Sequence, residues 1–251
     1  MISCKLAGGL GNYMFQIGAA SSLAYNNNDK TLFDFGPSVG QAHKNINKYS
    51  SNILRNIKIG ILTPEYAFNE AGDFTFYEIP YTKNLILQGY FQSEKYLDRE
   101  HILELYKIDD VTEEYIKTKY DPYFLENSIS IHVRRGDYIG RVRHPVQGME
   151  YYNKAMKHFS DTNFIVFSDD IEWCKENFKG DEFTFIQEDD YIDLYLMSMC
   201  QHNIIANSSF SWWGSYLNQN KDKIVIAPDN WFGTDRRLKT ENIYCKNWIK
   251  L

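Results

Sequence analysis

Short apolar runs alternate with longer mixed stretches along the second half of the chain. The apolar runs predict strands over residues 129–133, 164–167, 183–186, 203–206 and 224–227. The stretches between them predict helices over residues 150–159, 171–178, 191–200 and 210–218. Apolar strands that alternate with helices are typical of a parallel, doubly wound α/β sheet.

The first half opens as a strand, a glycine turn and a helix, and its later part is less regular. Strands are predicted over residues 2–6, 31–35 and 84–90, and helices over residues 13–25 and 94–120. Prolines and glycines interrupt residues 36–82, so no element is predicted there. Pro122 marks the expected boundary between an N-terminal domain, residues 1–125, and a C-terminal domain, residues 126–251, whose last helix can pack back on the first domain.

Polar clusters follow three of the strands predicted in the second half. They are His132 to Asp137, Ser168-Asp169-Asp170 and Asn207-Ser208-Ser209. Ligands of doubly wound sheets bind at the carboxyl ends of strands, near a reversal of strand order. The three clusters together therefore predict a binding site more strongly than any one of them.

Two adjacent arginines, Arg134 and Arg135, lie directly after a buried strand. Their charges repel each other, and Asp137 could neutralise only one of them. A diphosphate would satisfy both, because the guanidinium fork matches phosphate oxygens. A structural ion-pair cluster is the alternative, and for an isolated arginine pair it would be the better explanation.

Gly9, Gly11 and Asn12 lie in the turn between the first predicted strand and helix. Glycines allow a ligand to approach the backbone closely, and a helix N-terminus favours anions. With Asp34 further along, the turn resembles a dinucleotide fingerprint, which would indicate a nucleotide-dependent oxidoreductase. Met14 stands where that fingerprint has a third small residue, so a tight turn required only by the fold explains the glycines about as well.

Capping is the alternative explanation for several of these polar residues. Asp170 is expected to cap the helix that follows it, and Ser208 or Ser209 the next one. Asp169 could instead accept hydrogen bonds from a nucleobase or ribose. His132 has no second histidine at metal-ligand spacing, so no metal site is predicted.

The composition limits the partners of this chain of 251 residues. Its formal net charge of −6 argues against nucleic acid or an anionic membrane as the main partner. Four scattered cysteines suit a reducing compartment, and neither a signal peptide nor a membrane span is visible. The sequence predicts a cytoplasmic protein with at most peripheral membrane association.

The motifs together resemble the α-1,2-fucosyltransferases of glycosyltransferase family 11. The resemblance rests on four segments, GGLGNYMFQ at residues 8–16, HVRRGDY at 132–138, FSDD at 167–170 and NSSFSWWG at 207–214, and on the further segment LQGYFQS at 87–93. Tyr13 stands where the family usually has glutamine. The segments occur in the family's order and span most of the chain.

The resemblance implies a GT-B architecture, with two Rossmann-like domains facing a central cleft. It implies an inverting, metal-independent enzyme with no cofactor that moves L-fucose from GDP-β-L-fucose to the 2-hydroxyl of a galactoside or similar glycan acceptor. The catalytic residues would be Arg134, His132 and Asp137. The residues implied in donor binding are Gly9, Gly11, Asn12, His132, Arg134, Arg135, Asp169, Asn207, Ser208, Ser209 and Phe210.

Within this set, Arg134 is the expected ligand of the β-phosphate, and Arg135 has a supporting role in which Asp137 can hold it. His132 would lie near the nucleoside. Asp34 and Asp137 are candidates for a base that takes the acceptor's proton. The alternatives are a fucosyltransferase of different linkage or acceptor and a non-catalytic nucleotide- or sugar-binding module of the same fold.

Overall fold

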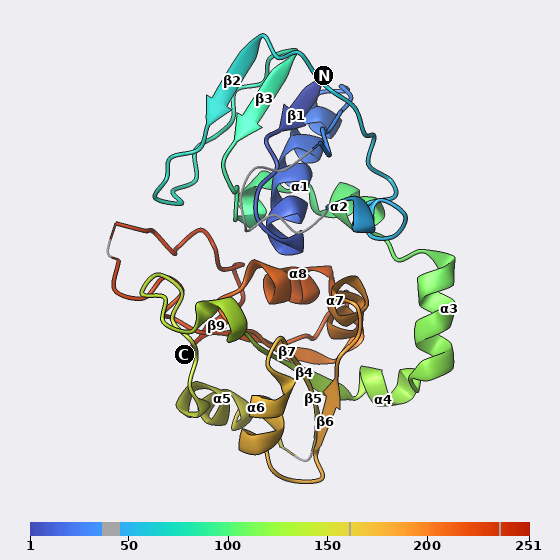
Figure 1. Cartoon of the computed structure of the whole chain (residues 1–251), viewed down its shortest axis with the longest axis vertical. Helices are drawn as coiled ribbons and strands as arrows, with labels where there is room; N and C mark the ends of the chain where they lie inside the picture. Colours follow the sequence, from blue (N-terminus) through green and yellow to red (C-terminus); the bar gives the residue numbers. More distant parts are fainter. Residues whose placement is uncertain (37–45, 161, 236) are drawn as a thin grey trace. The chain divides into compact units, whose positions relative to one another are not determined.

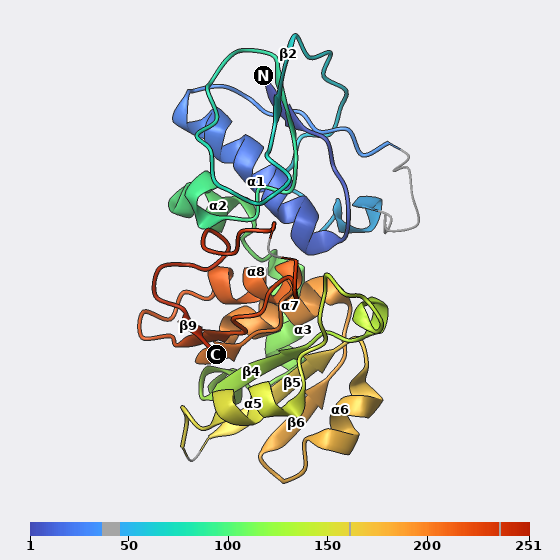
Figure 2. The same cartoon turned by 90° about the vertical axis from the view of Figure 1, so that its left-hand side faces the viewer.

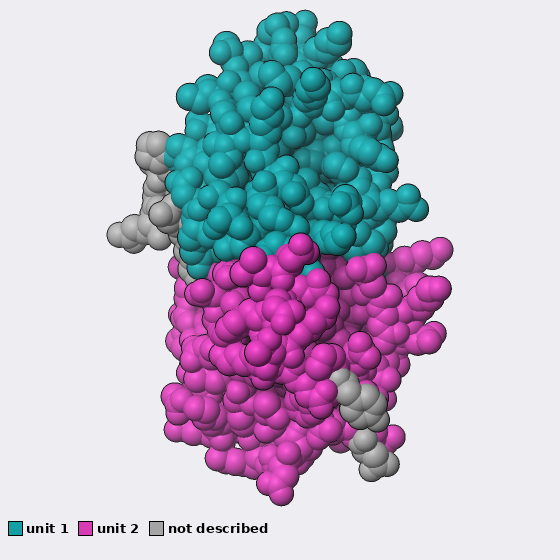
Figure 3. Space-filling view, turned by 90° about the vertical axis from the view of Figure 1, so that its right-hand side faces the viewer, with its two compact units in different colours: residues 1–109, 237–245 teal, residues 110–236, 246–251 magenta. Residues whose placement is uncertain are grey.

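The computed structural model describes residues 1–36, 46–160, 162–235 and 237–251. The chain divides into two compact units, residues 1–109 with 237–245 and residues 110–236 with 246–251 (Figure 3). The division precedes the boundary expected at residue 125, because helices α3 (Asp110–Lys119) and α4 (Pro122–Glu126) pack against α7 (Asp190–Met199). Residues 237–245 do belong with the first unit, but as turns rather than as a helix.

The first unit contains a parallel sheet in the order β1 (Ile2–Cys4), β3 (Leu85–Gln88), β2 (Tyr66–Asn69). Its helices are α1 (Leu10–Asn26) and α2 (Arg99–Leu105), with short 3-10 helices η1 (Ile46–Tyr49) and η2 (Glu94–Tyr96). Helix α1 packs on β1 and is buried along most of its length. Tyr13, the departure from the family pattern, is fully buried in this core.

Two elements predicted for this unit differ from the structure. Residues 31–35 form isolated bridges rather than a strand, because Asp34 turns the chain by accepting a hydrogen bond from the Gly36 N–H at 2.7 Å. The helix predicted over residues 94–120 is divided into η2, α2 and α3, since the side chains of Ser93 and Asp98 each cap a new start. Strand β2 was not predicted, and its mostly exposed side chains explain why it lacks an apolar pattern.

The second unit contains an all-parallel sheet of six strands in the order β6-β5-β4-β7-β8-β9. The strands are β4 (Ser128–Val133), β5 (Asn163–Ser168), β6 (Phe183–Ile186), β7 (His202–Ile204), β8 (Val225–Ala227) and β9 (Ile249–Lys250). The two-residue β9 is the one strand of this sheet that the sequence did not predict. The strand order reverses between β4 and β7, where a doubly wound sheet offers a binding crevice.

Helices cover both faces of this sheet (Figures 1 and 2). Helices α5 (Met149–Met156) and α6 (Ile171–Asn177) lie on one face, and α7 and α8 (Ser209–Leu217) lie on the other. The alternate residues of β4 from Ile129 to Val133 belong to the core cluster that includes side chains of α5 and α6. Because successive side chains of a strand point to opposite faces, Ser130 and His132 point toward α7 and α8. No helix in the described part of the chain combines the length and apolar character that crossing a bilayer requires.

Buried amides connect β7 to the elements on the α7–α8 face. The Asn203 Nδ2 group donates to Ser130 Oγ at 2.7 Å and to the Met197 carbonyl at 2.8 Å. The Asn218 Nδ2 group donates to Asn203 Oδ1 at 2.9 Å and to the Cys200 carbonyl at 2.7 Å. Both asparagines are almost fully buried, so water cannot replace a lost partner.

We expect Asn218→Ala to lower the free energy of unfolding by about 2–4 kcal/mol, because two buried acceptors lose their donor. Urea unfolding would measure the change. The neighbouring Gln219 is exposed, so Gln219→Ala is the matched control and should change stability by less than about 0.5 kcal/mol. Equal stability of the two variants would contradict a structural role for the amide network.

Candidate active site

The first predicted site residue, His132, lies at the carboxyl end of β4, and its side chain is 3% exposed. Its ring lies 5.4 Å from the ring of Phe210, at the start of α8. Its backbone carbonyl accepts a hydrogen bond from the Tyr152 hydroxyl at 3.2 Å, whereas its Nδ1 atom has no partner among the described residues. Burial, with a smaller effect of the Arg134 charge, lowers the pKa of His132 to about 3, so the ring is neutral near pH 7.

Arg134 lies one residue beyond β4 and is held by two carboxylates. Its Nη2 atom lies 2.6 Å from Asp137 Oδ1, and its Nη1 atom lies 3.1 Å from Asp169 Oδ2. The guanidinium carbon also lies 5.5 Å from the centre of the Tyr138 ring. The Nε atom is buried without a hydrogen-bond partner in the described structure, so one donor of this guanidinium is unused.

Arg135 points to different partners. Its Nε atom lies 2.9 Å from Asp170 Oδ2, and its guanidinium carbon lies 4.1 Å from the centre of the Trp173 ring. The expectation that Asp137 holds Arg135 is therefore wrong, because Asp137 pairs with Arg134 instead. The ion pairs that the alternative explanation of the arginines expected are present, because each arginine has at least one carboxylate partner.

Asp169 uses both carboxylate oxygens to fix the turn after β4. Oδ1 accepts a hydrogen bond from the Arg135 backbone N–H at 2.9 Å, and Oδ2 pairs with Arg134. A Cβ atom at Gly136 would lie 2.6 Å from Oδ2, so only glycine leaves room for this carboxylate. Asp170 caps α6, as predicted, by accepting from the Trp173 N–H at 3.3 Å.

The third polar cluster forms the start of α8. Ser208 caps the helix, as predicted, by accepting from the Phe210 N–H at 3.3 Å. Ser209 and Phe210 are partly exposed, whereas Asn207 is buried. The Tyr138 hydroxyl donates to the Asn207 carbonyl at 3.1 Å and thereby connects the β4 turn to α8. Burial raises the pKa of Tyr138 to about 12, so the hydroxyl keeps its proton.

Three residues that the sequence analysis did not single out support these clusters. Gln147 donates from Nε2 to Asn207 Oδ1 at 3.2 Å, while Trp173 lies against Arg135 and Tyr138 against Arg134. Tyr138 was visible as part of the family motif. Gln147 comes from the irregular segment between η3 (Gly136–Tyr138) and α5, where no pattern in the sequence indicates its partner.

In the first unit, Gly9 and Asn12 lie at the start of α1, where Gly9 occupies the N-cap position. A Cβ atom at Gly9 would meet nothing within 4 Å, so internal packing does not explain that glycine. Asn12 accepts a hydrogen bond at Oδ1 from Gln92 Nε2 at 2.8 Å. Asp34, the other base candidate, is exposed.

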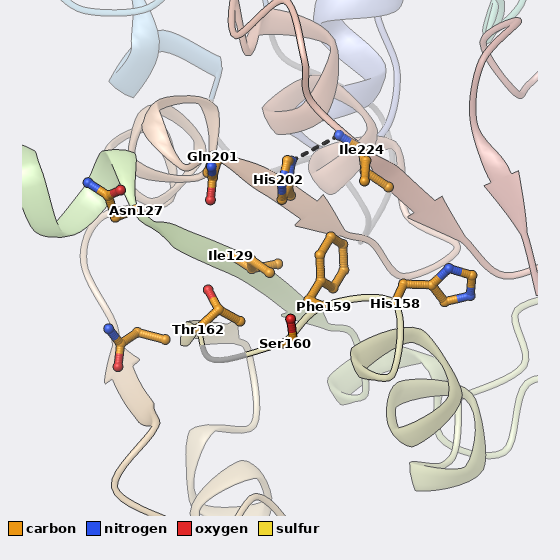
Figure 4. Close-up of a pocket in the computed structure, with 10 residues that line it drawn as sticks. Asn127, Ile129, His158, Phe159, Ser160, Thr162, Gln201, His202 and Ile224 are labelled. Atoms are coloured by element: carbon orange, nitrogen blue, oxygen red, sulfur yellow. Dashed lines mark hydrogen bonds between the residues drawn. The ribbon is translucent and has the colours of Figure 1, made fainter.

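A pocket of about 510 Å³ lies at the end of the second unit's sheet where the strands begin, away from these residues (Figure 4). Its lining includes Ile129, Asn163 and His202, which stand near the amino ends of their strands. His202 accepts a hydrogen bond from the Ile224 N–H at 3.0 Å and stacks on Phe159 at 5.1 Å. The pocket is therefore separate from the polar clusters at the carboxyl edge. Among the described residues, no group of three or more His, Cys, Asp or Glu side chains is arranged to hold a metal ion.

The buried, neutral His132 makes a testable contribution to the pH dependence of stability. Its folded pKa of about 3 is below the ordinary value of 6.5, so the unfolded chain takes up the proton first as the pH falls. His132 therefore costs no stability above pH 6.5 and costs progressively more between pH 6.5 and 3.

Between pH 7.5 and 5, we expect the wild-type chain to lose about 2 kcal/mol more stability than His132→Gln, which has no titrating ring. Urea unfolding of both proteins at the two pH values would measure this. Because other groups affect both proteins alike, the difference between them isolates His132. An equal loss would mean that the folded chain protonates His132 as readily as the unfolded chain does.

Solved structures share this fold. NodZ from Bradyrhizobium, a fucosyltransferase, matches with a TM-score of 0.55 at 15% sequence identity over 85% of this chain and 91% of its own. The likeness extends across both units and confirms the expected fold class, α/β of the GT-B type.

Two curated relatives match along the whole sequence, and a third matches about half of it. The O-antigen biosynthesis glycosyltransferase WbnK of Escherichia coli is 30% identical, with all of both chains covered. An alpha-1,2-colitosyltransferase of Escherichia coli is 28% identical over all of this chain and 99% of its own. Human galactoside alpha-(1,2)-fucosyltransferase 1 is 31% identical over 48% of this chain and 37% of its own. The family model of glycosyl transferase family 11 matches residues 1–251, and the chain therefore belongs to this family of glycosyltransferases.

Proposed function

We propose that this glycosyltransferase moves L-fucose from GDP-β-L-fucose to the 2-hydroxyl of a galactoside in a glycan, with inversion and without a metal ion. The observation that carries the proposal is the position of Arg134 at the reversal of strand order, with a buried Nε donor that no described residue uses. The matches to O-antigen and galactoside transferases support a glycan acceptor.

The charge that develops in the reaction explains why an arginine is suited to this position. Cleavage of the fucose–phosphate bond places positive charge on the ring and negative charge on the departing GDP. Donors fixed before the reaction stabilise that negative charge most effectively. In the proposed complex, Arg134 binds the β-phosphate, while the start of α8 at Ser208 and Ser209 favours the same charge.

The two carboxylates beside Arg134 are not equivalent. The Asp137 side chain is 49% exposed, so its pair with Arg134 contributes little and a phosphate can displace it. Asp169 is 26% exposed and also binds the Arg135 N–H, so it keeps Arg134 in place when the phosphate binds. If a phosphate displaced Asp137 from Arg134, the Asp137 carboxylate would be released. Asp137 is the candidate base in the turn after β4.

His132 and Arg135 have supporting roles in the proposed complex. His132 is neutral, and its Nδ1 atom has no partner in the part of the chain that the structure describes, so it can accept or donate one hydrogen bond to the nucleoside. Arg135 is committed to Asp170 and to Trp173, which makes it a second, weaker source of positive charge. Asp169 holds Arg134 in place, because its Oδ2 atom pairs with that guanidinium while its Oδ1 atom binds the Arg135 N–H.

Transfer of colitose is the second candidate, and the full-length match to a colitosyltransferase favours it. Colitose is fucose without its 3-hydroxyl, so both sugars present the same diphosphate to Arg134. The two functions differ in whether the site has a polar group that pairs with the 3-hydroxyl. A buried group built for that hydroxyl would select against colitose by several powers of ten.

A donor panel tests the proposal directly. We expect nucleotide release from GDP-fucose with a galactose-terminated acceptor, little release from UDP-sugars, and unchanged rates in EDTA. Faster release from GDP-colitose would favour the second candidate. Release from a UDP-sugar alone, or activity that EDTA abolishes and Mg²⁺ restores, would contradict the proposed donor or the metal-free reaction.

We expect Arg134→Ala to lower kcat/KM about 100- to 1000-fold or more, because the leaving diphosphate loses its main donor. The fold should survive, since the side chain is not part of the core, and circular dichroism would verify this. Lys175→Ala is the control: it removes a surface charge that pairs with Glu172 on α6 and should leave the rate nearly unchanged. Near-wild-type turnover of a folded Arg134→Ala protein would overturn the assignment.

A further inference from the structure

The pocket in the second unit is formed where three neighbouring strands begin (Figure 4). The register of the sheet starts β4, β5 and β7 side by side. Each of these strands is directly preceded by an uncharged polar residue that lines the pocket, and the three residues are Asn127, Thr162 and Gln201. Because parallel strands begin at the same edge of their sheet, three separate segments of the chain converge on one cavity.

The fold makes little use of the polar side chains in this lining. Those of Thr162, Asn163 and Gln201 form no hydrogen bond with another residue that the structure describes. The Gln201 backbone, in contrast, is held at both ends, because its N–H donates to the Ser128 carbonyl at 2.9 Å and its carbonyl accepts from Asn220 Nδ2 at 3.1 Å. The backbone is therefore fixed, while amide and hydroxyl groups are left for a ligand.

Aromatic and aliphatic side chains form the rest of the lining. Phe159 stacks on His202 with the ring centres 5.1 Å apart, and Ile129 and Ile224 lie beside them. The Ile224 N–H donates to His202 Nδ1 at 3.0 Å and so fixes the imidazole ring. Burial lowers the pKa of His202 from its ordinary value, so the ring is neutral near pH 7.

The composition of the lining limits the class of ligand. No Lys, Arg, Asp or Glu is among the described residues that line the pocket. These residues therefore offer neither the positive charge that suits a phosphate nor the carboxylates that suit a metal ion. Amides and hydroxyls beside an aromatic ring match a sugar instead, because sugar hydroxyls donate and accept hydrogen bonds and the C–H groups of the ring are apolar.

We propose that this pocket is a second carbohydrate-binding site, which takes a neutral mono- or disaccharide unit of a glycan. Its volume of about 510 Å³ lies within the range of about 300–1,000 Å³ that is usual for small-molecule sites. The six residues of β4 separate it from the Arg134 turn by about 20 Å, at about 3.3 Å per residue. The site is thus distinct from the proposed transfer site and does not depend on the identity of the donor.

Isoleucine methyl groups can report on binding, because Ile129 and Ile224 line the pocket. We expect lactose or methyl α-L-fucoside, titrated into protein with ¹³C-labelled isoleucine methyls, to shift these two NMR signals with a Kd on the order of 1 mM. Ile129→Val and Ile224→Val each remove one signal and so assign it. Inorganic phosphate should leave both signals in place. No shift with either sugar at about 50 mM, or an equal shift with phosphate, would overturn the proposal.

Two variants test whether the sugar binds in the pocket itself. Ser160 is exposed at the rim, so Ser160→Trp should fill the cavity and weaken sugar binding at least about tenfold. Gln201→Ala removes one hydrogen-bonding group and should weaken binding about 3- to 10-fold. Ser51→Trp and Gln219→Ala are the matched controls at exposed positions outside the pocket, and they should bind as wild type. Wild-type affinity of both pocket variants would overturn the proposal.

Transfer assays show whether the pocket is a second site. Both pocket variants should transfer sugar to a short acceptor at the wild-type rate, because the pocket lies outside the transfer site. A loss of transfer that matched the loss of lactose binding would mean that there is one sugar site rather than two, and would reject the proposal. The NMR titration uses no nucleotide sugar, so failure of GDP-fucose transfer would reject the proposed function alone.

Discussion

The position of Arg134 depends on the pairing of β4 with both β5 and β7 in one parallel sheet. The register aligns Val133 with Ser168 across β4–β5 and Ile131 with Ile204 across β4–β7. The three chain segments that leave these strands therefore start side by side at one edge. The acidic turn after β5 and the start of α8 reach the arginine turn only because of this alignment.

The Asp169 carboxylate fixes the turn that the alignment brings close to it. It binds the backbone of Arg135 and the side chain of Arg134 at once, and Gly136 leaves the space that it needs. Two arginines next to a buried strand would otherwise repel each other. Three nearby carboxylates offset this repulsion, yet the buried Nε atom of Arg134 has no hydrogen-bond partner among the described residues.

The sequence predicted the second unit better than the first, for physical reasons. Every strand of its sheet except the two-residue β9 appeared as a mostly apolar run, because strands covered by helices on both faces are rich in apolar residues. In the first unit, β2 is an exposed edge strand, so it lacks the apolar run that predicts a strand. Residues 31–35 have such a run, but their strand pairing ends at the Asp34 turn. The polar clusters at the strand ends were predicted because each directly follows a predicted strand.

Side-chain partners could not be predicted in the same way. Asp137 was the expected partner of Arg135, but the turn directs Arg134 to Asp137 and Arg135 to Asp170. Gln147 reaches Asn207 from an irregular segment, so only the folded backbone identifies it. The motif residues were therefore identified from the sequence, whereas the pairing of their side chains was not.

Asn12 and Asn207 illustrate what such supporting residues do. In each unit a glutamine donates to the oxygen of an asparagine at a strand-to-helix turn, Gln92 to Asn12 and Gln147 to Asn207. The Asn207 NH2 group also donates to the Trp231 carbonyl at 3.0 Å, so that side chain holds the loop before α8 from both ends of its amide. The same pair of residue types thus joins separate chain segments in both units, a role that motif similarity alone does not reveal.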